Sequence, residues 1–496
     1  MFESAELGHT LSKAAYDRQV PKLREALLDA QYGVLEQKRF ATVILINGVD
    51  GAGKGETVNI LNEWMDPRHI HTHAMTGATD EERDRPPYWR FWRALPPKGK
   101  VGVFFGSWYT DPILRRAYGK GGNAALDQAM DEVVRFERML VDEGVLLLKL
   151  WFHLSKQQQK ARLEALSSDK RTRWRVTERD WKHFELYDKF RKICERALRQ
   201  TSTADAPWRI VEGLDPRYRS ITAGRLVREA LEVRLDARAR VAPVRAAPPA
   251  PELEAGSVNL LASLDLSKSL ARKKYDVKLE KVQGRLNLLS REPKFARTGV
   301  VSVFEGVDAA GKGGAIRRVT QALDARRYHV VPIAAPTEEE RAQPYLWRFW
   351  RNVPAFGRVV VFDRSWYGRV LVERVEGFCS ERDWNRGYSE INDFEQQLSD
   401  HGLVVVKFWL QIGPDEQLAR FKERQATGFK RHKITAEDWR NRKRWKDYGQ
   451  AACAMFDRTS TEIAPWTIVE ANDKHYARIK VLETLCDRIE EAIERV

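Results

Sequence analysis

The stretch VVSVFEGVDAAGKGG, Val300 to Gly314, decides the fold of this chain. Its first five residues form an apolar run, which is typical of a strand buried on both faces of a parallel sheet. A glycine loop follows, in which Gly306 is separated by four residues from Gly311 and Lys312, the spacing of a Walker A motif. Glycines let backbone N–H groups turn inward around a phosphate, and a helix that begins near Gly313 points its positive end there. The stretch therefore predicts a phosphate-binding loop.

The same pattern occurs 258 positions earlier, as TVILINGVDGAGKGE from Thr42 to Glu56. EERDRPPYWRFWRALP pairs with EERAQPYLWRFWRNVP at the same spacing, and TSTADAPWRIVE pairs with TSTEIAPWTIVE. Such self-similarity indicates a duplicated domain. We therefore predict one domain over residues 1–240 and a second over residues 258–496, joined by an extended linker, rich in Ala and Pro, over residues 241–257.

Apolar strands alternate with helical stretches in each half. VVSVF, VVVFD and LVVVKFWL are continuous apolar runs, and the segments between them suit right-handed helical crossovers. Amphipathic stretches at Lys13 to Glu36 and Ser267 to Leu289 predict a helix before each core. The predicted fold class is α/β, with two tandem three-layer αβα domains and parallel sheets.

Composition limits the compartment and the partners. A formal net charge of +15 and a pI near 9.5 favour a polyanion, whether nucleic acid, an anionic membrane or a phosphate-rich small molecule. The four cysteines lie far apart and form no CxxC pair, which fits a reducing compartment. We expect no signal peptide and no membrane span, and hence a cytoplasmic protein.

A second carboxylate is predicted beside the loop. Gly313 stands where a Walker A motif usually has Ser or Thr, so Asp308 is the natural substitute for holding magnesium. Asp363 ends the apolar strand of VVVFDRSWYGR, and ligands bind at the carboxyl ends of parallel strands. Asp363 would then face magnesium as a Walker B carboxylate does. The alternative is an ordinary strand-end Asp that caps the next turn.

The two halves differ at this strand end. The first half has Phe105 and Gly106 where the second has Asp363 and Arg364, although it keeps Asp50 and Lys54. We expect the first half to be catalytically impaired while still able to bind phosphates, because metal-assisted transfer needs its carboxylates.

Two basic segments are candidate polyanion sites. In WRFWR, Arg348 and Arg351 share one helical face, which suits a nucleotide or polyanion groove, whereas the tryptophans suit the core. Gln417 to Arg444 is dense in Lys and Arg. It is either a solvated helical face or a lid that folds over phosphates and excludes water.

With GVDAAGKGG, DRSWYGRVLVERVEGF, INDFEQQL and TSTEIAPW, the chain closely resembles the polyphosphate kinase 2 family over about residues 10–235 and 265–490. The resemblance implies a P-loop kinase fold with a helical lid. It also implies Mg²⁺-dependent transfer of the terminal phosphoryl group of inorganic polyphosphate to a nucleotide, which in fused two-domain members is AMP. The predicted catalytic residues are Asp308, Lys312, Asp363 and Arg364, with Asp308 and Asp363 as metal ligands. The predicted phosphate and nucleotide site comprises Gly306, Gly311, Gly313, Arg348 and Arg351, and by resemblance Arg369, Glu373, Arg374, Arg420, Arg424 and Lys433.

Two other functions use the same features. An ATP-dependent nucleoside monophosphate kinase would need the same loop, although the excess of cations favours polyphosphate as donor. A non-catalytic polyanion- or RNA-binding protein would suit the degenerate first half. We expect polyphosphate and AMP as substrates, no nucleic acid or membrane partner, and either a homo-oligomer or an internal pseudo-dimer of the two halves.

Overall fold

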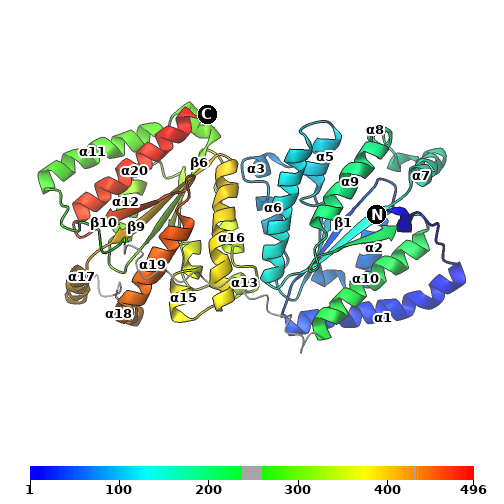
Figure 1. The fold of residues 1–496 in the computed structure, drawn as a ribbon, viewed down its shortest axis with the longest axis horizontal. Helices are drawn as coiled ribbons and strands as arrows, with labels where there is room; N and C mark the ends of the chain where they lie inside the picture. Colours follow the sequence, from blue (N-terminus) through cyan, green and yellow to red (C-terminus); the bar gives the residue numbers. More distant parts are fainter. Residues whose placement is uncertain (237–259, 429–431, 433, 496) are drawn as a thin grey trace. The chain divides into compact units, whose positions relative to one another are not determined.

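The computed structural model describes residues 1–236, 260–428, 432 and 434–495 (Figure 1). The predicted linker over 241–257 and the predicted lid residue Lys433 lie outside these residues. The chain forms two compact units, and each repeat supplies the sheet of one of them. Of the described residues, the first unit comprises those within 1–78, 90–236 and 336–348, and the second comprises those within 79–89, 260–335 and 349–495.

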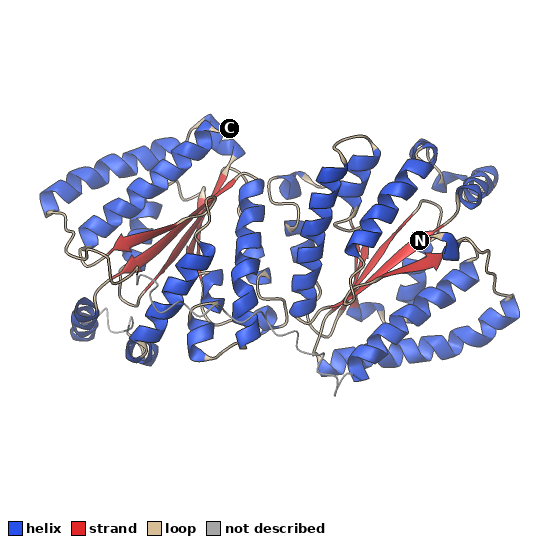
Figure 2. Cartoon of the chain, viewed as in Figure 1, coloured by secondary structure: helices blue, strands red, loops and turns tan. Residues whose placement is uncertain are grey.

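Each sheet has five parallel strands (Figure 2). Those of the first sheet, in the order β2-β3-β1-β4-β5, are β1 (Thr42–Gly48), β2 (Ile70–Ala74), β3 (Val101–Phe105), β4 (Leu146–His153) and β5 (Trp208–Glu212). Those of the second, in the order β7-β8-β6-β9-β10, are β6 (Gly299–Gly306), β7 (Tyr328–Pro332), β8 (Val359–Asp363), β9 (Leu403–Gln411) and β10 (Trp466–Glu470). The shared strand order confirms the predicted α/β fold in both repeats.

Helices connect the strands and flank both sheets. The first repeat has α1 (Lys13–Gln37), α2 (Lys54–Trp64), α3 (Asp80–Arg83), α4 (Trp89–Ala94), α5 (Thr110–Ala117), α6 (Asn123–Asp142), α7 (Lys156–Ser168), α8 (Glu178–Glu185), α9 (Tyr187–Thr201) and α10 (Pro216–Asp236). The second has α11 (Arg272–Leu289), α12 (Lys312–Gln321), α13 (Glu338–Arg341), α14 (Trp347–Trp350), α15 (Val372–Glu376), α16 (Glu381–Asp400), α17 (Pro414–Ala426), α18 (Ala436–Lys443), α19 (Trp445–Thr459) and α20 (Lys474–Glu494). Short 3-10 turns lie at Glu3–Ala5, Pro67–His69, Arg173–Arg175, Pro293–Arg297 and Trp366–Arg369.

The layers are clearest in the second repeat, where α11, α12 and α20 cover one face of the sheet and α16 and α19 lie on the other (Figure 1). Between the sheet and α11, α12 and α20 lies a continuous apolar core that includes Phe304, Val406, Leu482 and Ile489. α11 is the helix predicted from the amphipathic stretch before the second core, and α1 is its counterpart. In the described residues, no helix is both long and apolar enough to cross a membrane. The four cysteines form no disulfide in the described part of the chain.

A buried ion pair supports the strand ends. Lys407 is fully buried in β9, and its Nζ donates to Glu395 Oε2 at 2.7 Å, to the Tyr367 hydroxyl at 2.8 Å and to the Thr459 carbonyl at 2.7 Å. Trp366 Nε1 also donates to Glu395, at 3.0 Å. These bonds fix the segment that follows β8, and the first repeat contains the same cluster around Lys149. A buried charge is tolerated only when it is paired and hydrogen-bonded in this way.

Candidate active site

The phosphate-binding loop of the second half connects β6 to α12. Gly306 has φ +138°, and a Cβ there would lie 2.3 Å from the carbonyl oxygen of Leu410, so only glycine fits. Gly311, with φ +107°, is the N-cap of α12. The positive end of this helix therefore faces the loop. Lys312 Nζ donates to the Gly306 carbonyl at 2.7 Å, which folds the lysine back along the loop.

The end of β8 brings the second acidic residue to the loop. Asp363 lies opposite Phe304 in the register of β8 and β6, two residues before the loop begins. The next residue, Arg364, donates from its backbone N–H to the Phe304 carbonyl at 3.0 Å. Its Nη2 lies 3.4 Å from Asp308 Oδ1. The structure thus gathers Asp308, Asp363 and Arg364 at one edge of the sheet.

Backbone strain marks the same place. Ala309 (φ +62°) and Arg364 (φ +65°) adopt the left-handed conformation, which costs a residue with a side chain about 1–2 kcal/mol. The first half has Gly51 and Gly106 at these two positions, also with positive φ. Strain of this kind persists where the surrounding structure over-determines it, often at functional sites. The second half keeps an arginine at a position where glycine would adopt the same backbone conformation without strain. This points to a role for the Arg364 guanidinium.

Glu305 is a site residue that sequence reasoning missed. It is 6% exposed and accepts a hydrogen bond from Ser365 Oγ at 2.8 Å. Burial raises the pKa of Glu305 even though the charges of Lys312 and Arg364 act to lower it. The available signal was an acidic residue at the end of an otherwise apolar strand, where the first half has Asn47.

The basic segment forms helices beside the loop, and α18 contacts the loop acid directly. Asn441 Nδ2 donates to Asp308 Oδ2 at 2.8 Å, and Glu437 lies 3.9 Å from Arg364. The Tyr448 hydroxyl donates to Asn441 Oδ1 at 3.2 Å. These contacts favour the lid interpretation. Asn441 and Tyr448 were not predicted, because nothing in a run of lysines and arginines singles out one amide.

Arg420 has a different role from the predicted one. It is 4% exposed, and its guanidinium donates to the carbonyls of Ala309, Ala310, Ala471 and Asn472 at 2.7–3.1 Å. Glu416 takes the remaining Nε–H. These bonds hold the phosphate loop from behind rather than leaving the guanidinium open to a phosphate.

The other predicted cations also have partners within the protein. Arg348 is buried and lies 3.4 Å from Glu340, whereas Arg351 is exposed. Arg369 pairs with Glu373 at 3.4 Å. Arg374 donates to the Tyr388 hydroxyl at 2.8 Å and lies over the ring of Trp384.

A basic cavity of about 180 Å³ lies beside Gly311 and Gly314, and Arg424 lines it together with Lys474 and Arg478. Gly313 lies in the first turn of α12.

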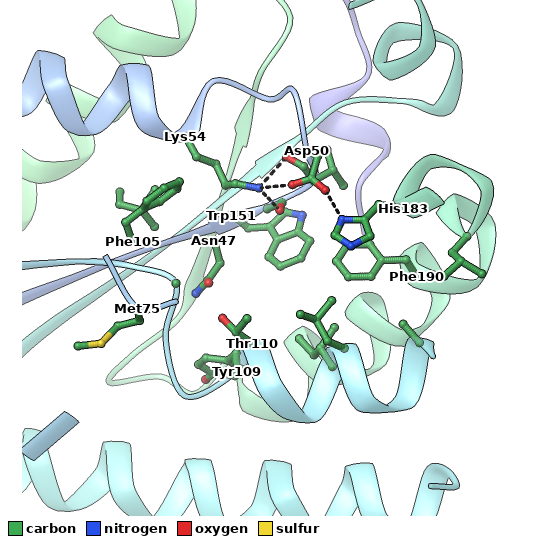
Figure 3. Close-up of a pocket in the computed structure, with 18 of the residues that line it drawn as sticks. Asn47, Asp50, Lys54, Met75, Phe105, Tyr109, Thr110, Trp151, His183 and Phe190 are labelled. Atoms are coloured by element: carbon green, nitrogen blue, oxygen red, sulfur yellow. Dashed lines mark hydrogen bonds and ion pairs between the residues drawn. The ribbon is translucent and has the colours of Figure 1, made fainter. Parts of the chain in front are cut away.

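The corresponding place in the first half is organised differently. Asp50 accepts hydrogen bonds from Lys54 at 3.3 Å and from His183 at 2.7 Å. Burial acts to raise the pKa of Asp50, but the Lys54 charge and the His183 hydrogen bond hold it below its ordinary value. Phe105 occupies the strand end where the second half has Asp363 (Figure 3). The strand therefore ends in a phenyl ring rather than a carboxylate that could bind a metal.

Comparison with known proteins gives a consistent result. The sequence model of the polyphosphate kinase 2 family matches residues 10–239 and 269–495. A polyphosphate:AMP phosphotransferase of Pseudomonas aeruginosa is 57% identical over 496 residues, covering the whole of both chains. One from Acinetobacter johnsonii is 37% identical and covers 93% of this chain and 94% of that protein. A crystal structure of a putative polyphosphate kinase 2 from Pseudomonas aeruginosa matches with a TM-score of 0.89 and 55% identity over both whole chains.

Proposed function

This chain belongs to the polyphosphate kinase 2 family, and on that premise we propose that it transfers the terminal phosphoryl group of inorganic polyphosphate to AMP, giving ADP. The observation that carries the proposal is the meeting of Asp308, Lys312, Asp363 and Arg364 at one sheet edge of the second half. Full-length relatives named polyphosphate:AMP phosphotransferase support the choice of donor and acceptor.

The protein's own groups supply binding and positioning. The loop N–H groups and the end of α12 bind the phosphate to be transferred, and Lys312 adds a full positive charge beside them. Arg364 neutralises charge on the phosphoryl oxygens as the bond to the leaving phosphate lengthens. Helix α18 covers the loop and keeps water from the transferred group.

The carboxylates fit a hard divalent cation, and we propose Mg²⁺ held by Asp308 and Asp363. Mg²⁺ is usually bound by one or two carboxylates together with substrate phosphates, rather than by a complete protein cage. When bound, such an ion neutralises phosphate charge and aligns donor with acceptor.

The test is direct. The purified full-length protein is incubated with AMP and Mg²⁺, and with either polyphosphate or ATP as donor, and ADP is followed by chromatography. With ATP, the same mixture lacking enzyme corrects for hydrolysis. We expect ADP with polyphosphate and none after chelation of the metal. ADP formed only with ATP would identify an ATP-dependent kinase, and no ADP with either donor would favour a binding protein.

A further inference from the structure

The first half contains a cavity of about 280 Å³ at the place that corresponds to the active site of the second half (Figure 3). It lies between the end of β1, the glycine loop, α5 and the start of α9. This volume is close to the lower end of the range for small-molecule sites, about 300–1,000 Å³. Trp151, Phe190 and the apolar side of α5 form much of its wall, with the Asp50–His183 pair at one end.

Several charged groups of the second half have no charged counterpart around this cavity. The lining residues Phe105, Gly106, Tyr118 and Leu186 stand at the positions of Asp363, Arg364, Glu376 and Arg444, and Phe190 stands at that of Tyr448. The lining keeps charged side chains at Asp50, Lys54 and Arg179. A polyphosphate needs cations along its path, and its phosphates are costly to bury without them. The part of the cavity walled by these uncharged residues therefore suits an uncharged part of a ligand.

Three arginines beside the loop already share an internal carboxylate. Glu56, in the first turn of α2, stands where the second half has Gly314. Its carboxylate lies 2.5 Å from Arg219 Nη2, 3.3 Å from Arg162 and 3.4 Å from Arg175. A phosphate chain would have to displace this carboxylate to reach the same guanidinium groups. The Glu56 carboxylate would therefore compete with any phosphate for these arginines, which weakens our expectation that the first half binds phosphates.

Two buried polar atoms of the wall have no hydrogen-bond partner in the described structure: the indole N–H of Trp151 and the amide oxygen of Gln159. Both residues are 3% exposed and line the cavity. In the second half the matching atoms are satisfied, since Trp409 donates to Gln411 at 2.9 Å and Arg442 donates to Gln417 at 3.1 Å.

The first half has lost both of these partners. His153 and Phe184 stand where the second half has Gln411 and Arg442. An unpaired buried polar group costs about 1–3 kcal/mol, so a ligand that supplies one acceptor and one donor is favoured.

We propose that the first half binds an uncharged planar heterocycle, a purine base either free or in a nucleoside, in this cavity. The aromatic walls offer faces on which a planar ring can stack. The Trp151 N–H and the Gln159 oxygen are buried in this wall, and a small shift of the wall on binding would make them a donor and an acceptor for the hydrogen-bonding edge of such a ring. This site is separate from the phosphoryl transfer proposed for the second half, so either proposal can fail without the other.

The test is isothermal titration calorimetry of the full-length protein with adenosine and, in a second arm, with adenine. Binding of adenine as tightly as adenosine identifies the base as the ligand, whereas a preference for adenosine shows that the ribose also contributes. We expect one site per chain, and we expect Arg364→Ala, in the second half, to leave it unchanged. Leu186→Arg introduces the residue that the second half has at this position and should weaken binding at least tenfold.

The matched control is Val233→Arg, which adds the same charge at an exposed position of α10 and should bind as the wild type does. Folding of each variant is checked by circular dichroism. If Leu186→Arg fails to fold, Trp151→Phe decides, because it replaces the indole with a smaller phenyl ring, which removes both the unpaired N–H and part of the stacking face, and it should weaken binding several-fold. Absence of binding by both compounds, loss of binding in Arg364→Ala, or unchanged affinity in Trp151→Phe would overturn the proposal.

Discussion

Replacing Arg364 by glycine should separate stability from activity. Glycine relieves the left-handed strain at φ +65°, about 1–2 kcal/mol, but costs about 0.5–1 kcal/mol in the entropy of the unfolded chain. The lost pair with Asp308 adds at most about 1 kcal/mol, since Arg364 is 45% exposed and the atoms are 3.4 Å apart. These terms nearly cancel, so the melting temperature of Arg364→Gly should stay within about 4 °C of the wild type.

Activity should fall much further. A cation that neutralises the transferring phosphoryl group is worth about 10²–10⁴ in rate, by analogy with electrostatic groups in other phosphoryl-transfer and oxyanion sites. The assay is the initial rate of ADP formation from AMP and polyphosphate, with thermal unfolding followed by circular dichroism on the same samples. Arg364→Lys is the control that keeps the charge and the strain but loses the planar fork, and it should retain intermediate activity.

Two results would refute this reasoning. If Arg364→Gly keeps more than a tenth of wild-type activity, the guanidinium is not needed for the transfer. If the variant melts more than about 10 °C lower, Arg364 is chiefly a structural residue and the loss of rate reflects damage to the fold.

Four further outcomes are expected. Asp363→Asn should lower turnover at least tenfold at saturating Mg²⁺ with the circular dichroism spectrum unchanged, and a smaller loss would remove Asp363 from the metal site. Raising the salt concentration should increase the KM for polyphosphate far more than the KM for AMP, because screening acts on every phosphate contact; equal slopes would contradict an extended cationic site. Lys407→Met should cost about 3–5 kcal/mol in urea unfolding because it leaves Glu395 buried without its partner, and a cost below 1 kcal/mol would show that the cluster contributes little. Burial acts to raise the pKa of Glu470, but hydrogen bonds from Lys268 and Lys480 lower it from 4.5 to about 2. The ionised Glu470 therefore contributes at most about 3 kcal/mol to the free energy of unfolding, in full above pH 4.5, and this contribution is lost as the pH falls toward 2. The stability difference between wild type and Glu470→Gln should shrink over that range, and a difference independent of pH would contradict the assignment.

The features that the sequence predicted well depend on local pattern. Glycine spacing and an apolar run fix the loop after β6, and the end of an apolar run fixes Asp363 at the edge of the same sheet. The duplication helped, because the same strand order in both repeats follows from one pattern that occurs twice. Such inferences need only the chain direction and the rule that parallel strands share their carboxyl ends.

The unpredicted features depend on which side chains meet across long distances in the sequence. Arg420 looked like one cation among many, yet its position places its guanidinium against four carbonyls from two separate segments. Asn441 contacts Asp308 only because α18 folds over the loop, 133 residues away in sequence. Glu56 resembles any acidic residue in the first turn of a helix, and three arginines surround it only in the folded chain. Sequence spacing carries no information about such meetings.

The cluster around Lys407 has a consequence for how the second domain folds. One ammonium group joins Tyr367 after β8, Glu395 on α16, and Thr459 at the end of α19, although β9 carries the lysine itself. A partly folded chain that lacks any one of these segments would bury a charge with an incomplete set of partners, which is costly in a low-dielectric interior. Intermediates with one segment undocked are therefore penalised, and these four elements should assemble and unravel together in a single cooperative transition.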